Sequence, residues 1–158
     1  MYNKNSSNRG INAFLIVFGT LLIASCAGSS KFSKDNITIE MEKTSCYGSC
    51  PVYTLQIDRN GNGRFSGVEN TEYIGLYSFR ISDEEHLQLK QAFENVGFFD
   101  LKDKYYDNVT DLPTIYVTYR DDGRKKKIMD YYGAPPELKD LEKQIESLVL
   151  PGKMKKIK

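Results

Sequence analysis

Six segments of the chain are predicted to be strands, and in two of them, 37–41 and 52–57, apolar and polar residues alternate as in a strand that buries one face. The six segments are 37–41, 52–57, 64–68, 73–81, 114–119 and 125–131. Asn60-Gly61 separates the second segment from the third, and Asp122-Gly123 separates the fifth from the sixth. Both dipeptides favour two-residue turns with positive φ, so the sequence predicts two antiparallel hairpins.

Two other segments show the 3.6-residue period of amphipathic helices. Ser82 followed three residues later by Glu85 is a capping box that begins the first helix, and Gly97 ends it. The second helix is predicted to begin at Pro135 or Pro136, since Pro is tolerated in a first helical turn. The apolar stripes are Leu89, Ala92, Phe93 and Val96 in the first helix, and Leu138, Leu141, Ile145 and Leu148 in the second.

The predicted elements follow one another in the order β-β-β-β-α-β-β-α. Because hairpins make neighbouring strands antiparallel, we expect an α+β fold: a mostly antiparallel sheet of about six strands with both helices on one face. We expect a single domain over residues 36–150, which is long enough to bury a continuous core. A basic tail, 151–158, follows it.

The start of the chain has the pattern of a secretory leader. Lys4 and Arg9 precede the apolar stretch 11–23, which is too short to span a bilayer. Residues 22–25 resemble the lipobox that precedes the acylated Cys of bacterial lipoproteins. This resemblance implies that a signal peptide, 1–25, is removed and that Cys26 becomes the lipid-bearing first residue.

Cys26 is therefore expected to be the site of lipid attachment and to hold the chain on a membrane. Two or three acyl chains anchor a soluble domain firmly, since each buried methylene contributes about 0.8 kcal/mol. Ala27 at the next position resembles lipoproteins sent to the outer membrane. We expect a bacterial envelope protein, lipid-anchored in the outer membrane and facing the periplasm, with 26–35 as lipidated Cys and flexible tether.

Cys46 and Cys50 are the cysteines that remain once Cys26 is acylated. An even pair in an oxidising compartment favours a disulfide, which is our main interpretation. A redox-active pair is one alternative. A metal site is the other, because Cys-x3-Cys-Pro superficially resembles the motif of thioredoxin-fold copper-delivery proteins, and soft thiolates bind Cu(I). His86, the only His, would then have to supply the third ligand.

Residues 58–69 match the calcium-binding pattern D-x-N-x-N-G-x5-E, which begins at Asp58 and ends at Glu69. Strand-like sequence flanks this loop, whereas an EF-hand needs helices on both sides, and only two of its ligands carry charge. We therefore interpret the segment as a hairpin turn of Asn and Gly, and we expect no metal site.

Acidic and tyrosyl residues recur around the second hairpin, where paired carboxylates could carry out acid–base chemistry if they were buried together. The ordinary interpretation is Asp in turns and Tyr on a strand surface. If a ligand patch exists, we place it on the loop 110–113 and the turn 132–135, because loops held by a rigid scaffold carry function. Its candidate residues are Asp111, Asp130 and Tyr132.

Basic residues cluster at 124–127 and in the tail. They could contact an anionic surface, where each Lys contributes about 1 kcal/mol, but we favour a charged sheet edge and a frayed tail. The formal net charge is only +1, so we expect no nucleic-acid partner. With one His and no Gly-rich phosphate loop, we expect no catalytic residues and no cofactor.

Four motifs remain: TSCYGSCPVY at 44–53, FFDL at 98–101, TDLPT at 110–114 and DYYGAP at 130–135. Through them the chain resembles an uncharacterised family of bacterial envelope domains, many of them lipoproteins. The resemblance implies the domain's extent and an envelope location, and no catalytic residue. We expect a non-enzymatic module that binds an envelope protein, a peptide or a wall component. The alternative is a thiol-dependent redox or copper-handling protein that uses Cys46 and Cys50.

Overall fold

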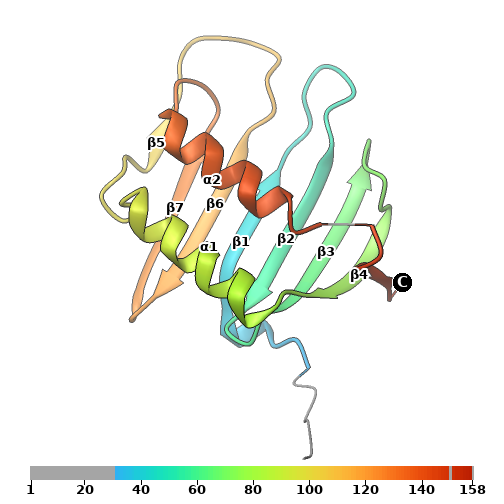
Figure 1. Cartoon of the computed structure of the whole chain (residues 1–158). Helices are drawn as coiled ribbons and strands as arrows, with labels where there is room; N and C mark the ends of the chain where they lie inside the picture. Colours follow the sequence, from blue (N-terminus) through green and yellow to red (C-terminus); the bar gives the residue numbers. More distant parts are fainter. Residues whose placement is uncertain (1–30, 150, 158) are drawn as a thin grey trace, which may run out of the picture.

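Eight strands form one sheet, and two helices cover one of its faces (Figure 1). The computed structural model describes residues 31–149 and 151–157, so Cys26 and the predicted leader lie outside the described residues. The expected α+β fold, with a mostly antiparallel sheet, is confirmed. The elements are η1 (Lys34–Asn36), β1 (Ile37–Lys43), β2 (Val52–Asp58), β3 (Asn62–Glu69), β4 (Gly75–Arg80), α1 (Asp83–Asn95), β5 (Lys104–Tyr105), β6 (Ile115–Asp121), β7 (Arg124–Asp130), α2 (Pro136–Glu146) and β8 (Lys155–Lys156).

The strand order across the sheet is β5-β7-β6-β1-β2-β3-β4-β8. Strands β1 to β4 form a meander, and the hairpin of β6 and β7 joins it on the free side of β1. Both predicted turns are present, with positive φ at Gly61 and Gly123. All neighbouring strands are antiparallel except β5 and β7, which are parallel.

Two of the eight strands are short additions to the expected six. β5 pairs with the last residues of β7, and β8 pairs with the edge strand β4. The backbone N–H of Ile157 also donates to Leu76 O, at 2.7 Å. The expected frayed tail is therefore wrong for residues 155–157. Alternation cannot reveal a two-residue strand, which forms here because β4 would otherwise leave backbone groups unpaired.

The helices begin where their sequence signals place them. The backbone N–H of Glu85 donates to Ser82 Oγ at 3.1 Å, and the N–H of Ser82 donates to Glu85 Oε2 at 2.7 Å, which is the predicted capping box. α2 begins at Pro136, with Pro135 at the N-cap position. Between the helices and the sheet lies one core, in which Phe93 of α1 stacks on Tyr119 of β6 with ring centroids 4.0 Å apart. Leu138, Leu141 and Ile145 of α2 are buried, as predicted, together with Glu142. Leu148 is also buried, but it follows the end of the helix at Glu146.

The connections between the strands gather at two opposite ends of the sheet (Figure 1). We call one the loop end; it consists of residues 44–51, 70–74, 106–114 and 131–135. The other, which we call the tether end, consists of residues 31–36, 59–61, 81–82 and 122–123. The described part of the chain contains no helix long and apolar enough to cross a membrane.

Candidate functional site

The connections at the loop end are bound to one another by hydrogen bonds and ring contacts. The N–H of Thr44 donates to Thr114 O, and the N–H of Thr114 donates to Thr44 Oγ1, each at 3.0 Å. The hydroxyl of Tyr131 donates to Val109 O at 2.8 Å, and its ring stacks on that of Tyr106 at 5.4 Å. The loop 106–114 is thus held against both the disulfide-bearing loop and the turn before α2.

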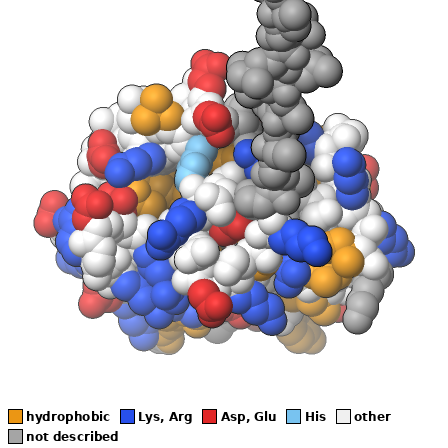
Figure 2. All heavy atoms as spheres, turned by 90° about the horizontal axis from the view of Figure 1, so that it is seen from below, with side chains coloured by type: hydrophobic (Ala, Val, Ile, Leu, Met, Phe, Trp, Pro, Cys, Tyr) orange, Lys and Arg blue, Asp and Glu red, His pale blue; other side chains and the backbone are white. Residues whose placement is uncertain are grey.

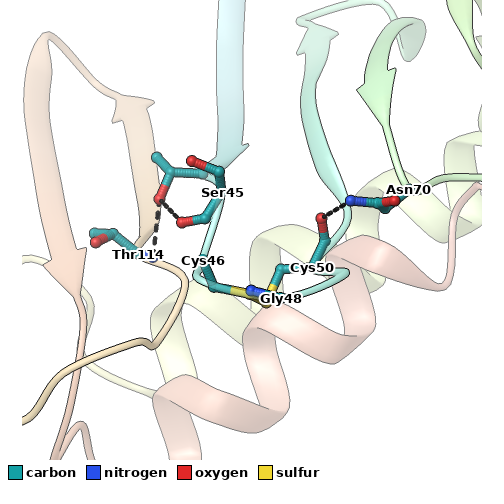
Figure 3. The surroundings of a disulfide bond; sticks show 7 residues. Ser45, Cys46, Gly48, Cys50, Asn70 and Thr114 are labelled. Atoms are coloured by element: carbon teal, nitrogen blue, oxygen red, sulfur yellow. Dashed lines mark hydrogen bonds between the residues drawn. A yellow bond between two sulfur atoms is a disulfide. The ribbon is translucent and has the colours of Figure 1, made fainter.

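Cys46 and Cys50 are joined by a disulfide at the tip of the β1–β2 connection, with Cα atoms 5.7 Å apart (Figure 3). The N–H of Gly48 donates to Cys46 Sγ at 3.2 Å, inside the ring that the disulfide closes. Asn70 donates its side-chain amide to Cys50 O at 3.2 Å, which ties this loop to the β3–β4 connection. The cysteines are therefore at bonding distance, as the main interpretation predicts.

The three residues of the predicted ligand patch do not share one surface. Asp111 is exposed and has a φ of +71°, and Tyr132 is exposed on the neighbouring turn. Asp130 is 1% exposed and points beneath α2, where it forms an ion pair with Lys139. The structure thus brings Asp111 and Tyr132 to the loop-end surface and places Asp130 in the interior.

Asp130 belongs to a buried group of charges that the sequence analysis did not identify. Glu142 of α2 is 3% exposed, and Lys139 Nζ lies 3.8 Å from its Oε2. Burial, followed by the nearby Asp130 carboxylate, raises the pKa of Glu142 to about 8. Among the described residues, neither Asp130 Oδ1 nor Glu142 Oε1 has a hydrogen-bond partner. A proton retained on Glu142 supplies a donor to this pair of carboxyl groups.

A second polar group lies one helical turn further along α2. Glu146 Oε1 accepts a hydrogen bond from the Tyr53 hydroxyl and lies 2.8 Å from Lys43 Nζ. Burial and the Glu146 carboxylate raise the pKa of Tyr53, so this phenol stays protonated. The three side chains line a cleft of about 330 Å³ at the loop end. The other residues that line it include Pro51, Phe65, Asn70, Glu72 and Val149.

A sequence signal for these acids was available. Glu142 lies four residues after Leu138, and Glu146 lies four residues after Glu142, so both fall close to the apolar stripe of α2. A carboxyl group at such a position needs a partner, because a buried charge is otherwise costly. The partners, Asp130, Lys43 and Tyr53, come from strands far away in sequence and could not be assigned before the packing of α2 was known.

The alternative metal sites are not assembled. Among residues 31–149 and 151–157, no group of three His, Cys, Asp or Glu side chains could hold a metal ion. Asp58 instead organises the hairpin: its Oδ1 accepts from the N–H of Asn60 at 2.8 Å and of Asn62 at 3.0 Å. Glu69 lies at the far end of β3. His86 is in the first turns of α1, at the tether end, whereas both cysteines are at the loop end.

A family described as a domain of unknown function, DUF6438, matches residues 37–149. The chain belongs to the DUF6438 family. No curated protein and no solved structure matches the chain. The DUF6438 domain runs from β1 to the turn after α2, so it includes the loop end, the disulfide and the cleft beside Glu146. The short elements η1 and β8 flank the matched residues.

Proposed function

We propose that this DUF6438 protein is a lipid-anchored module of the bacterial envelope that binds a protein, a peptide or a wall component through its loop end. The lipobox-like sequence before Cys26 supports the anchor, although these residues lie outside the described part of the chain. The module has no enzymatic role in this proposal, and its task is recognition.

Exposed apolar side chains at the loop end are the observation that carries the proposal. Tyr47 at the tip of the disulfide loop is 90% exposed, and Tyr106, Leu112 and Tyr132 are between 40% and 56% exposed. They belong to three connections that hydrogen bonds and the sheet hold together. Large apolar and aromatic side chains, presented by rigid loops, are typical of surfaces that bind a partner.

The cleft beside Glu146 adds a polar component to this surface. Lys43 and Tyr53 offer donors and Glu146 offers acceptors, while Phe65 and Val149 supply apolar walls. A cleft with mainly apolar walls and a few fixed polar groups suits one side chain or sugar of a larger ligand. Lys43 and Glu146 form an ion pair, and Glu72 adds a second acidic side chain to the lining, so the cleft favours a neutral polar or cationic group over an anion.

The position of the loop end also agrees with an anchored module. Strands β1, β2, β6 and β7 each have seven residues and separate the two ends by about 20 Å. Residue 31 lies at the tether end, so a lipid on Cys26 would attach on that side. The loop end would then face away from the membrane and toward envelope partners.

Site-specific crosslinking in intact bacterial cells tests this proposal. A photo-reactive amino acid replaces Tyr47 or Tyr132 at the loop end, and Leu87 serves as the matched control because it is 57% exposed on α1. We expect the same discrete adduct from both loop positions and none from Leu87. Absence of an adduct from both loop positions, or the same adduct from Leu87, would contradict recognition by the loop end.

A further inference from the structure

A cleft of about 650 Å³ lies away from the loop end. It is formed by the β3–β4 hairpin, by residues 31–32 and by residues 152–157 of the C-terminal tail. We call it the basic cleft, because five cationic side chains line it: Lys31, Arg64, Arg80, Lys153 and Lys155. None of the described residues that line it is Asp or Glu. Figure 2 views the molecule from the tether end and shows Lys and Arg side chains gathered along parts of this end.

Most of the positive charge in the basic cleft is not neutralised. Of its five cations, only Lys153 forms an ion pair with a described residue, at 2.5 Å from Glu85 Oε1. Arg80 donates to the neutral side chain of Asn62 at 2.9 Å. The guanidinium of Arg64 lies 4.4 Å from the ring centre of Phe32, and its Nε is buried without a hydrogen-bond partner among the described residues. Such a cleft attracts an anion.

The apolar part of the basic cleft indicates what kind of anion fits. Phe32 and Phe79 line it together with Ile157, which is 46% exposed. A small inorganic anion gains nothing from contact with these side chains, whereas a phosphate ester with an apolar portion buries surface against them. The combination of cations and aromatic rings therefore favours an amphiphilic phosphate over free phosphate.

The place of the basic cleft along the chain indicates the source of that ligand. Lys31 lies five residues after Cys26, a distance that an extended chain spans within about 18 Å. This step rests on the proposed function, since it needs an acyl group on Cys26. The acyl chains would hold the cleft next to phospholipid headgroups. Asp83, Glu84 and Glu85 begin α1 at the same end. Arg59 and Arg124 at this end lie in a group that includes Asp121 and Asp122, whereas no acidic side chain is among the described residues that line the basic cleft.

We propose that the basic cleft binds the phosphate headgroup of an anionic phospholipid in the membrane that holds the chain. Arg64, Arg80 and Lys155 contact the phosphate, and Phe32 and Ile157 contact the apolar part next to it. Part of the cleft comes from residues 31–32 and 152–157, which lie outside the match to the family. Headgroup binding would fix the orientation of the domain, with the loop end directed away from the bilayer.

Titration of the purified full chain with a soluble lipid analogue tests the proposal. The probes are dihexanoylphosphatidylglycerol below its micelle concentration, dihexanoylphosphatidylcholine and inorganic phosphate, with binding followed by calorimetry. We expect saturable binding of the phosphatidylglycerol and much weaker binding of the other two. Equal affinity for inorganic phosphate, or no saturable binding of the phosphatidylglycerol, would overturn the proposal.

Variants locate the binding site. Arg64→Gln with Lys155→Gln should weaken phosphatidylglycerol binding by about tenfold or more, since two cations that meet the phosphate are lost. Lys155→Gln alone changes an exposed side chain, so a several-fold loss in this variant cannot come from unfolding. Lys125→Gln, an exposed cation on β7, is the matched control and should bind like the unaltered chain. An equal loss in Lys125→Gln would place the binding elsewhere and contradict the proposal.

The titration is also independent of the lipid anchor, because the probes are soluble and no membrane is present. If Cys26 carries no lipid in cells, the proposed function is contradicted. If that chain still binds the phosphatidylglycerol, binding by the basic cleft is supported nevertheless. An acylated chain that does not bind the phosphatidylglycerol would contradict the basic cleft alone.

Discussion

Replacement of Glu142 by Gln should remove a pH dependence from the stability of the domain. The pKa of Glu142 is about 8 in the folded protein, against an ordinary value of 4.5, because the group is buried beside Asp130. The folded state therefore binds more protons than the unfolded state between these two pH values. Stability is greatest at low pH and falls as the pH rises through this window, toward the folded pKa.

The size of the effect follows from the width of that window. One pKa unit corresponds to about 1.4 kcal/mol, so Glu142 should lower the free energy of unfolding by about 3 kcal/mol between pH 5 and pH 8. The Lys139 cation lowers the pKa of Glu142 and the Glu146 carboxylate raises it. Both side chains are retained in the Glu142→Gln variant. The amide that this substitution introduces can still donate a hydrogen bond to Asp130, as the protonated acid does. The difference between the two proteins thus isolates the ionisation of Glu142.

Urea unfolding at several pH values, followed by far-UV circular dichroism because the chain has no Trp, measures this difference. The unaltered protein should lose stability relative to Glu142→Gln as the pH rises from 5 to 8. Glu137→Gln, an exposed acid on the same helix, is the control and should follow the unaltered protein. Parallel stability curves for the unaltered protein and Glu142→Gln over this range would refute the buried carboxyl pair.

Three further substitutions test the fold by urea unfolding. Gly63→Ala should destabilise the domain by about 1–3 kcal/mol, because the added Cβ would overlap the ring of Phe79. Gly48→Ala is the control and should change little, because the nearest atom to its added Cβ is Cys46 Sγ at 3.8 Å. Equal effects of the two substitutions would contradict the packing of β3 on β4. Ser82→Ala should cost about 1 kcal/mol through the lost cap on α1, and an unchanged midpoint would count against the capping box. Cys46→Ser with Cys50→Ser should cost about 2 kcal/mol, since the disulfide closes a short loop. Thiol titration of the unaltered protein should find neither Cys46 nor Cys50 as a free thiol until a reductant is added. Copper uptake by the unaltered protein that is lost in the Cys46→Ser variant would instead favour the thiol-dependent alternative.

The local elements of the fold could be predicted because their signals are local. Asn60-Gly61 and Asp122-Gly123 determine two hairpins, and Ser82 with Glu85 determines the start of α1. The order of the strands could not be predicted in the same way. β1 pairs with β6, which follows more than seventy residues later, and nothing in either strand identifies the other as its neighbour.

The sites show the same difference between local and distant information. The disulfide joins cysteines four residues apart, and the exposed Asp111 and Tyr132 lie on the loops that the sequence indicated. Asp130 is expected beside Tyr132 because the two residues are close in sequence. Side chains alternate between the two faces along β7, however, and the Asp130 side chain points toward α2. The basic cleft combines residues 31–32 with strands β3 and β4 and with residues of the C-terminal tail, which the two-residue strand β8 holds in place.

The lipid on Cys26 is the claim on which the proposed function and the orientation of the domain depend. Intact-mass spectrometry of the protein purified from bacterial membranes tests it most directly. We expect a chain that begins at Cys26 and carries the added mass of a diacylglyceryl group and an N-terminal acyl chain. A chain that still begins at Met1, or a Cys26 without added mass, would contradict it.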